Sequence, residues 1–477
     1  MLLKRFHDPK LAQTSYLVGC HGSREALVVD PNRDIDRYLE AAQEEGLRIA
    51  HVTETHIHAD FVSGARELAH RTGARLYLSA AGGPDWSYQY AAAARATLIQ
   101  GDSSFRVGAV ELRALHVPGH TPEHLAFLVT DTETASEPMG VFTGDFLFVG
   151  DVGRPDLLER AVQAKGTMEV EARRLFQSLQ RFRALPDFLQ IWPGHGAGSA
   201  CGKSLSAVPH STLGYETRFN WAFAIEDEDA FVRAVLAGQP DPPRYFARMK
   251  RVNQSGPTLP GGLQRPPSLP VAALTSVLNQ GGTVVDTRPA RDFANGAIPG
   301  TINIPAKRTF TTWAGSLLPY DQDFYLIVDE NRAGLADELA RDLAGIGLDR
   351  LAGYFGSEVV DAWRGLRGQL QTIPEITMAD LAGRLRAHAG DQTVLDVRGA
   401  GEWEAGHIPG ARNIPVGELD QRLDEIPRDR PVIVHCQTGA RAAMAASILR
   451  ARGISDVQQF PGGFAEWRAA GQPVELA

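Results

Sequence analysis

The chain has 477 residues, of which 43% are hydrophobic and 22% are charged. At roughly 150 residues per domain, this length suggests about three domains, and the composition excludes wholesale disorder, a collagen-like repeat and a membrane-spanning bundle. The 48 Lys and Arg against 57 Asp and Glu give a formal net charge of −9, which argues against nucleic acid as the main partner.

The 3 cysteines are too few for a disulfide framework in so long a chain. The first residues contain no apolar core of signal-peptide length. No stretch approaches the roughly 20 consecutive apolar residues of a membrane span. We therefore expect a protein of the reducing cytoplasm.

Residues 1–245 are predicted to form one domain. The apolar runs 26–29 and 141–143 lie beside Asp or Gly turns and predict strands. The amphipathic stretches 35–45 and 64–72 lie between such runs and predict helices. Strands that alternate with helices indicate a layered α/β domain.

The second half of the chain contains an internal repeat. Val284–Pro305 and Val394–Pro415 align without a gap, and about half of their positions are identical. Each copy continues with a second apolar strand and a helical pattern, which predicts parallel α/β sheets. We therefore place domains at 268–373 and 376–477, after a Pro- and Gly-rich linker at 246–267.

Four polar loops follow strand-like runs in the first domain, where ligands converge in α/β folds. In chain order they contain His56-Ile57-His58-Ala59-Asp60, Gly119-His120-Thr121, Thr143-Gly144-Asp145 and Pro193-Gly194-His195. This order of motifs resembles the metallo-β-lactamase superfamily over roughly residues 14–200. The resemblance implies an αββα sandwich with metal at one edge of the sheets.

The residue after Asp60 predicts a single metal ion. A two-metal member of the superfamily would have His there, whereas this chain has Phe61, which cannot bind metal. The remaining set, His56, His120 and Asp145, is the facial triad typical of non-heme Fe(II) oxygenases, with positions left open for O₂ and substrate. We therefore predict one Fe(2+) per chain.

Further polar side chains are predicted near this ion. His58 is either a fourth ligand, which would favour zinc, or a hydrogen-bond partner of the ligands, which we prefer. Asp60 and His195 are expected to support the ligands in the same way. Arg154 either orients the substrate or lies in a salt bridge. Cys201 carries a persulfide, contacts the substrate or is a partly buried loop thiol; Cys20 is assigned no role.

Longer stretches of sequence around these motifs indicate one branch of the superfamily. ETHIHADFVSG, PGHTPEH and TGDFLFVGDVGRPDL are similar to the persulfide dioxygenase branch of the superfamily. The resemblance implies that His56, His120 and Asp145 bind iron. It also implies oxidation of the outer sulfur of a low-molecular-weight persulfide with O₂. Glutathione, coenzyme A and bacterial equivalents all remain open as the carrier thiol.

A reactive cysteine is predicted in the last domain. Residues 432–434 predict a strand and residues from Ala442 onward a helix, so Cys436 lies where helix N–H groups stabilise a thiolate. Arg441 adds positive charge. A tyrosine-phosphatase loop has five residues between Cys and Arg. This loop has four, which suits a single bound sulfur; they are Gln437, Thr438, Gly439 and Ala440.

The stretches LDVR (395–398), GHIPGARNIP (406–415) and GGFAEW (462–467) resemble rhodanese motifs. The resemblance implies an active α/β rhodanese domain. In the middle copy, aligning the second strands puts Glu330 at the position of Cys436 and Leu335 at that of Arg441. We therefore expect the middle copy to be an inactive rhodanese domain.

The order of the domains resembles bacterial fusions of a persulfide dioxygenase with a sulfurtransferase. It implies that a thiol persulfide is oxidised to sulfite, and that Cys436 passes sulfur to sulfite or takes it from thiosulfate. A zinc thioester hydrolase of the glyoxalase II type fused to rhodanese stays open, as does a non-catalytic sulfur carrier or sensor. We expect small-molecule partners (a thiol persulfide, O₂, sulfite or thiosulfate), neither nucleic acid nor membrane, and a homo-oligomer.

Overall fold

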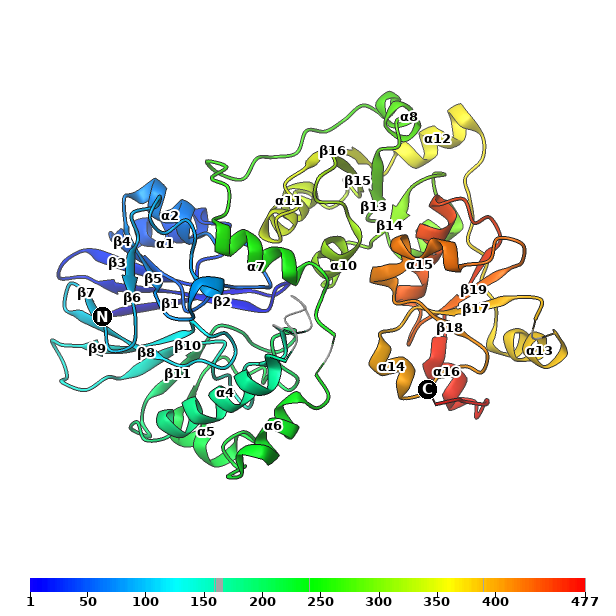
Figure 1. The fold of residues 1–477 in the computed structure, drawn as a ribbon. Coiled ribbons are helices and arrows are strands. Elements are labelled where there is room, and N and C mark those ends of the chain that lie inside the picture. Colours follow the sequence, from blue (N-terminus) through cyan, green and yellow to red (C-terminus); the bar gives the residue numbers. More distant parts are fainter. Residues whose placement is uncertain (158, 160–165, 240, 389, 477) are drawn as a thin grey trace. The chain divides into compact units, whose positions relative to one another are not determined.

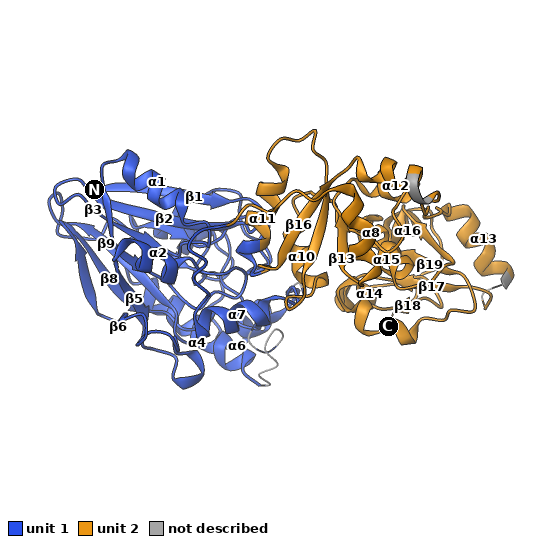
Figure 2. Cartoon of the chain, turned by 90° about the horizontal axis from the view of Figure 1, so that it is seen from above, with its two compact units in different colours: residues 1–263, 344–347 blue, residues 264–343, 348–477 orange. Residues whose placement is uncertain are grey.

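A computed structural model describes residues 1–157, 159, 166–239, 241–388 and 390–476 (Figure 1). The chain divides into two compact units. The first comprises residues 1–263 and 344–347, and the second residues 264–343 and 348–477 (Figure 2).

The described residues of the first unit form two six-stranded sheets, in the orders β1-β2-β3-β4-β5-β6 and β12-β11-β10-β9-β8-β7. The strands of the first sheet are β1 (Leu2–Asp8), β2 (Gln13–Cys20), β3 (Glu25–Val29), β4 (Arg48–Thr53), β5 (Arg75–Ser79) and β6 (Thr97–Ile99). Those of the second are β7 (Ser104–Val107), β8 (Val110–His116), β9 (Leu125–Asp131), β10 (Gly140–Gly144), β11 (Gln190–Pro193) and β12 (Ser211–Thr212). The helices given by the described residues are α1 (Asp36–Glu44), α2 (Ala65–Thr72), η1 (Pro84–Trp86), α4 (Met168–Phe182), α5 (Leu213–Phe219), α6 (Glu228–Leu236) and α7 (Phe246–Ser255).

The first unit has four layers: helices, two sheets, and helices again. Successive side chains of a strand point to opposite faces of its sheet, so both faces of each sheet can be buried. Val28 of β3 packs with Tyr38 of α1 and Leu68 of α2 on the outer face of the first sheet. Its neighbour Leu27 packs in the cluster between the sheets, together with Leu112 of the second sheet. Helices α4 and α6 cover the other face of the second sheet. The predicted αββα sandwich is confirmed.

In the part of the second unit that the structure describes, two parallel four-stranded sheets have equivalent orders, β14-β13-β15-β16 and β18-β17-β19-β20. The strands are β13 (Thr283–Asp286), β14 (Ile302–Asn303), β15 (Phe324–Val328), β16 (Leu351–Gly356), β17 (Thr393–Asp396), β18 (Arg412–Asn413), β19 (Val432–His435) and β20 (Val457–Phe460). The helices are α8 (Val271–Asn279), α9 (Ala290–Asn295), α10 (Phe310–Leu317), α11 (Leu335–Gly345), α12 (Val359–Arg367), α13 (Met378–His388), α14 (Ala400–Glu404), η2 (Val416–Gln421), η3 (Leu423–Glu425), α15 (Ala440–Ala451) and α16 (Gly463–Ala469). The predicted parallel α/β sheets are confirmed.

Helix α15 lies between the two copies. Its residues from Ala442 to Leu449 are all buried, and it packs on β19 and β20 of its own sheet and on β14 of the middle copy. The hydroxyl of Ser447 accepts a hydrogen bond of 2.9 Å from the backbone N–H of Asn303. The apolar side chains on all sides of this helix are therefore covered by two different sheets.

The segment predicted as a linker at 246–267 begins with a helix, so that part of the prediction is wrong. Helix α7 buries Phe246, Met249 and Asn253 in the first unit. These residues recur at spacings of three and four, which fits one face of a helix. Only the later residues 257–267, all described, have no helix or strand.

Within the described part of the chain, we find no helix that is both long and apolar enough to span a bilayer.

Candidate functional site

The three predicted metal ligands converge in the first unit. His56 follows β4, His120 lies between β8 and β9, and Asp145 follows β10. All three are buried, and one ligand atom of each lies within 4.8 Å of the others. Asp145 Oδ2 is 3.9 Å from His56 Nε2 and 3.6 Å from His120 Nε2.

The chemistry of this set fits a metal ion. Asp145 Oδ2 has no hydrogen-bond partner among the described residues. A buried carboxylate oxygen without a partner costs free energy unless a cation compensates it. An ion held by this oxygen and by the Nε2 atoms of His56 and His120 would satisfy all three atoms.

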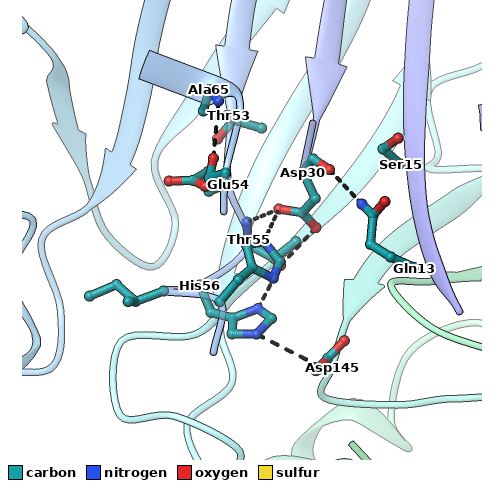
Figure 3. A network of polar contacts seen from close by, with 12 residues as sticks. Gln13, Ser15, Asp30, Thr53, Glu54, Thr55, His56, Ala65 and Asp145 are labelled. Atoms are coloured by element: carbon teal, nitrogen blue, oxygen red, sulfur yellow. Dashed lines mark hydrogen bonds and ion pairs between the residues drawn. The ribbon is translucent and has the colours of Figure 1, made fainter. Parts of the chain in front are cut away.

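Hydrogen bonds at the far ring nitrogens orient both imidazoles, and Figure 3 shows the bond at His56. The hydroxyl of Thr55 donates to Asp30 Oδ2 at 2.9 Å, so Thr55 Oγ1 accepts from His56 Nδ1–H, also at 2.9 Å. His120 Nδ1–H donates to the carbonyl oxygen of Arg154 at 3.0 Å. Each ring then keeps the lone pair of Nε2 for a metal.

Asp30 is a central residue that the sequence analysis missed. Its Oδ1 accepts the backbone N–H of Thr55 at 2.7 Å and lies 3.2 Å from His58 Nε2. Gln13 donates to its carbonyl oxygen at 2.8 Å. Burial lowers the pKa of His58, but the Asp30 carboxylate outweighs burial and the pKa rises to about 9. In the structure His58 bonds to Asp30 and is not one of the three convergent ligands.

His124 also escaped the sequence analysis, although it is the second histidine of the PGHTPEH motif. Its ring stacks on that of His56 at 4.7 Å, and its Nε2 accepts the backbone N–H of Asp145 at 3.0 Å. Gly144 permits this approach: its φ is +50°, and a Cβ there would lie 2.9 Å from His124 Cε1.

A second polar group lies on the other side of Asp145. His195 Nδ1 is 2.7 Å from Asp145 Oδ1, and its Nε2 is 2.7 Å from Asp60 Oδ2. Burial lowers the pKa of His195, but the two carboxylates outweigh burial and raise it well above its usual value. Cys201 completes this buried group: one ligand atom each of Asp60, His195 and Cys201 also lies within 4.8 Å of the others. Burial raises the pKa of the Cys201 thiol well above the usual value. Phe61 is fully buried, so hydrocarbon fills the position where two-metal relatives have His.

Arg154 is buried, and its guanidinium is already paired. It donates to both carboxylate oxygens of Asp156, at 2.8 and 2.7 Å, and to the carbonyl oxygen of Ala200 at 3.0 Å. This is the salt-bridged arrangement of the two that were predicted. The contact with His120 is made by the backbone carbonyl of Arg154, so this residue holds the His120 ring through its main chain and not through its guanidinium.

The predicted sulfur-binding loop joins β19 to α15. Cys436 Sγ accepts the backbone N–H of Gly439 at 3.1 Å. Gly439 has a φ of +90°, and a Cβ there would lie 2.3 Å from the carbonyl oxygen of Pro461. From α16, the N–H of Phe464 donates to the carbonyl oxygen of Cys436 at 2.7 Å. The sulfur is thus held at the N-terminus of a helix, where N–H groups favour an anion.

Both arginines beside this loop are paired with carboxylates. Arg441 makes two hydrogen bonds with Glu402, of 2.5 and 2.8 Å. Arg398 donates to both oxygens of Asp396, and its guanidinium lies 4.1 Å from the ring centre of Phe464. The positive charge that the sequence predicts at Arg441 is therefore balanced by Glu402, which the sequence analysis missed.

The strand register corrects the alignment of the middle copy. In the last domain, Asp396 pairs with the residue before Cys436. Its equivalent Asp286 pairs with the residue before Val328. Val328 therefore takes the position of Cys436, and Glu330 lies two residues further on, in the loop. The conclusion that this copy has no reactive cysteine stays the same.

The second half of that alignment changes as well. Gly334 and Gly439 both have positive φ and directly precede a helix. Five residues lie between Val328 and Gly334, and two lie between the equivalent Cys436 and Gly439, so the loop of the middle copy is three residues longer. Ala336, and not Leu335, then occupies the position of Arg441. A loop of this length without cysteine or arginine at these positions cannot form the same cradle.

The αββα sandwich and the group of His56, His120 and Asp145 at the ends of its strands together indicate a class of metal-dependent proteins. Residues 8–195 match the family model of the metallo-beta-lactamase superfamily, and residues 378–470 match the rhodanese-like domain. The chain belongs to the metallo-β-lactamase superfamily and carries a rhodanese domain in its C-terminal part.

Three known proteins to which the chain is similar illustrate this membership. The crystal structure of a metallo-beta-lactamase from Staphylococcus aureus subsp. aureus COL is 42% identical, with a TM-score of 0.66, and the match covers 75% of this chain and 99% of that one. The mitochondrial persulfide dioxygenase ETHE1 of Bos taurus is 29% identical over 200 residues, 41% of this chain and 68% of its own length. A hydroxyacylglutathione hydrolase of Cereibacter sphaeroides is 34% identical over 184 residues, 38% of this chain and 61% of its own length. Eight such curated relatives are matched over 44% to 72% of their lengths.

Proposed function

We propose that this chain is an enzyme of sulfur metabolism that oxidises a thiol persulfide with O₂ in its first unit and transfers sulfane sulfur at Cys436 in its second. The observation that carries the proposal is the three-ligand set. His56, His120 and Asp145 converge, while the buried ring of Phe61 replaces a ligand of the second metal site. Similarity to a persulfide dioxygenase supports the proposed oxidation of a persulfide in the first unit.

The residues present fit Fe(II). Two imidazole nitrogens and one carboxylate oxygen, from three separate loops, leave the remaining coordination positions for other ligands. When bound there, ferrous iron supplies the activation of O₂ beside the substrate sulfur. Thr55 orients the His56 ring and the Arg154 carbonyl orients the His120 ring. His195 holds the second oxygen of Asp145.

The chemistry proposed at Cys436 needs no metal. Its thiolate attacks the outer sulfur of a persulfide, so that a new S–S bond forms while the old one breaks and the thiol leaves with the electron pair. Sulfite then attacks the outer sulfur on Cys436, thiosulfate leaves, and the thiolate is restored. The N–H of Gly439 is placed to stabilise the thiolate at the start and end of this cycle.

The partners that we propose are a small thiol persulfide, O₂, and sulfite or thiosulfate, with the chain acting as a homo-oligomer. Cys201 is proposed to contact the persulfide from the far side of Asp145. Because burial raises the pKa of this thiol, it would act there as a neutral group.

Metal analysis and oxygen uptake test the oxidative half. We expect about one iron per chain and O₂ uptake with glutathione persulfide or coenzyme A persulfide. The second candidate is a zinc thioester hydrolase, which the similarity to a hydroxyacylglutathione hydrolase favours. Two zinc ions per chain, hydrolysis of lactoylglutathione and no O₂ uptake would support that candidate and reject the dioxygenase.

Asn253 of α7 is expected to stabilise the loop that carries His58. Its Nδ2 donates to the carbonyl oxygens of His58 and Phe61, at 2.8 and 2.7 Å, and its Oδ1 accepts the N–H of Ser63 at 2.9 Å. Asn253→Ala leaves three buried backbone groups unpaired, so we expect the free energy of unfolding to fall by roughly 2–4 kcal/mol. Urea unfolding of the full chain measures this loss. Arg251→Ala, at an exposed position of the same helix, is the control and should change stability by less than about 0.5 kcal/mol.

A further inference from the structure

The salt bridge between Arg441 and Glu402 lies beside the reactive sulfur. Cys436 is buried, whereas the side chains of Arg441 and Glu402 are 21% and 39% exposed. Two parallel hydrogen bonds fix the guanidinium against the carboxylate. The N–H of Gly399 donates to Glu402 Oε2 at 3.2 Å and holds the carboxylate in place. The pair is therefore both ordered and reachable from solvent.

Arg441 interacts with both Glu402 and Cys436. Burial lowers the pKa of Arg441, but Glu402 and the sulfur of Cys436 outweigh burial and raise it. Burial raises the pKa of Glu402, but Arg441 outweighs burial and lowers it. Both members of the pair are thus charged at neutral pH. An anionic sulfur compound that approaches Cys436 meets a cation whose charge is already compensated.

Arg398, the other arginine beside the loop, cannot take this role. Its side chain is 2% exposed, and its guanidinium bonds to Asp396 and to the carbonyl oxygen of Gly406. Its contact with the loop is a long one, 3.4 Å to Gln437 Oε1. Of these two arginines, Arg441 is the one that an incoming anion can reach.

We propose that Glu402 is a positioning residue that sets donor specificity: by holding Arg441, it weakens the binding of the dianion thiosulfate relative to a persulfide. This inference rests on the proposed sulfur transfer at Cys436. With thiosulfate as donor, the Cys436 thiolate attacks the outer sulfur, a new S–S bond forms, the S–S bond of thiosulfate breaks, and sulfite leaves with the electron pair. Cyanide then removes the bound sulfur as thiocyanate and restores the thiolate.

Steady-state kinetics of Glu402→Gln with two donors test the proposal, with cyanide as the acceptor. We expect the KM for thiosulfate to fall about fivefold, the size of a modest ion-pair effect, with kcat changed less than about twofold. The kcat/KM for cysteamine persulfide, which carries a positive amine, should change less than about twofold. Glu404→Gln, at an exposed position of the same helix, is the matched control and should resemble the wild type.

A thiosulfate KM that stays the same or rises in Glu402→Gln would overturn the proposal. Equal changes for both donors would also overturn it, because a merely structural role affects both donors alike. Glu402→Asp keeps the charge and should return the thiosulfate KM toward the wild-type value.

A second measurement does not depend on turnover. Inorganic sulfate should protect Cys436 from alkylation by iodoacetamide, followed by mass spectrometry of the Cys436 peptide. In Glu402→Gln, the sulfate concentration that gives half protection should fall about fivefold, and an unchanged concentration would contradict the proposal. If the wild type transfers sulfur from neither donor, the proposed function fails, and the sulfate measurement still decides the role of Glu402.

Discussion

The His120→Ala variant is expected to lose O₂ consumption on thiol persulfides while it still transfers sulfur from thiosulfate to cyanide. His120 supplies one of three convergent ligand atoms, and its Nε2 lies 3.6 Å from Asp145 Oδ2. Removal of a hydrogen-bond partner of a ligand already costs about 10–100-fold in metal affinity or activity, so loss of the ligand itself should exceed that range. An oxygen electrode and a thiocyanate assay on the same preparation measure both activities.

His210→Ala is the matched control, because His210 is an exposed histidine of the same unit. It should retain iron and both activities. Persistent O₂ uptake in His120→Ala would remove this residue from the metal site. Loss of both activities in a folded protein would contradict the picture of two independent sites.

The Cys436→Ser variant is expected to show the reverse pattern, with O₂ uptake retained and sulfite accumulating in place of thiosulfate. A serine hydroxyl at the N-terminus of α15 can accept the Gly439 N–H, but it does not form the thiolate that attacks a sulfane sulfur. We expect sulfur transfer to fall at least about 100-fold. Sulfite and thiosulfate, derivatised and separated from one reaction, give the measurement.

Cys20→Ser serves as the control, because Cys20 ends β2 in the first unit and has no role in the proposed chemistry. This variant should form thiosulfate like the wild type. Continued thiosulfate formation by Cys436→Ser would mean that another group, with Cys201 the first to examine, accepts the sulfur.

The convergence of His56, His120 and Asp145, and the place of Cys436 before a helix, could be predicted because each residue lies in a short motif at the end of an apolar strand. Asp60 and His195 were predicted as supporting residues because they lie in the same motifs, whereas other supporting residues come from distant parts of the chain and could not be predicted. Asn253 is 195 residues from His58, and Glu402 is 39 residues from Arg441. Asp30 follows an apolar strand as the ligands do, which is the one local signal that could have drawn attention to it.

The two errors have physical causes as well. A strand in which all residues are apolar does not show its pairing register in the sequence. The predicted alignment of the middle copy was therefore wrong by two residues, and it put Glu330 at the position that Val328 occupies. The register is fixed by pairing with β13, which the sequence does not display. Helix α7 was hidden because the Pro- and Gly-rich stretch that follows it dominates the composition of the whole segment.

The position of α15 has a consequence for how this protein can be divided. A fragment that contained only the last rhodanese copy would expose the apolar side chains that now face β14, and would leave Ser447 without the Asn303 amide. Such a fragment is expected to aggregate, even though every residue of its reactive loop is present. Fragments for separate study should therefore keep both copies together, with the middle copy retained as the cover of the helix that follows Cys436.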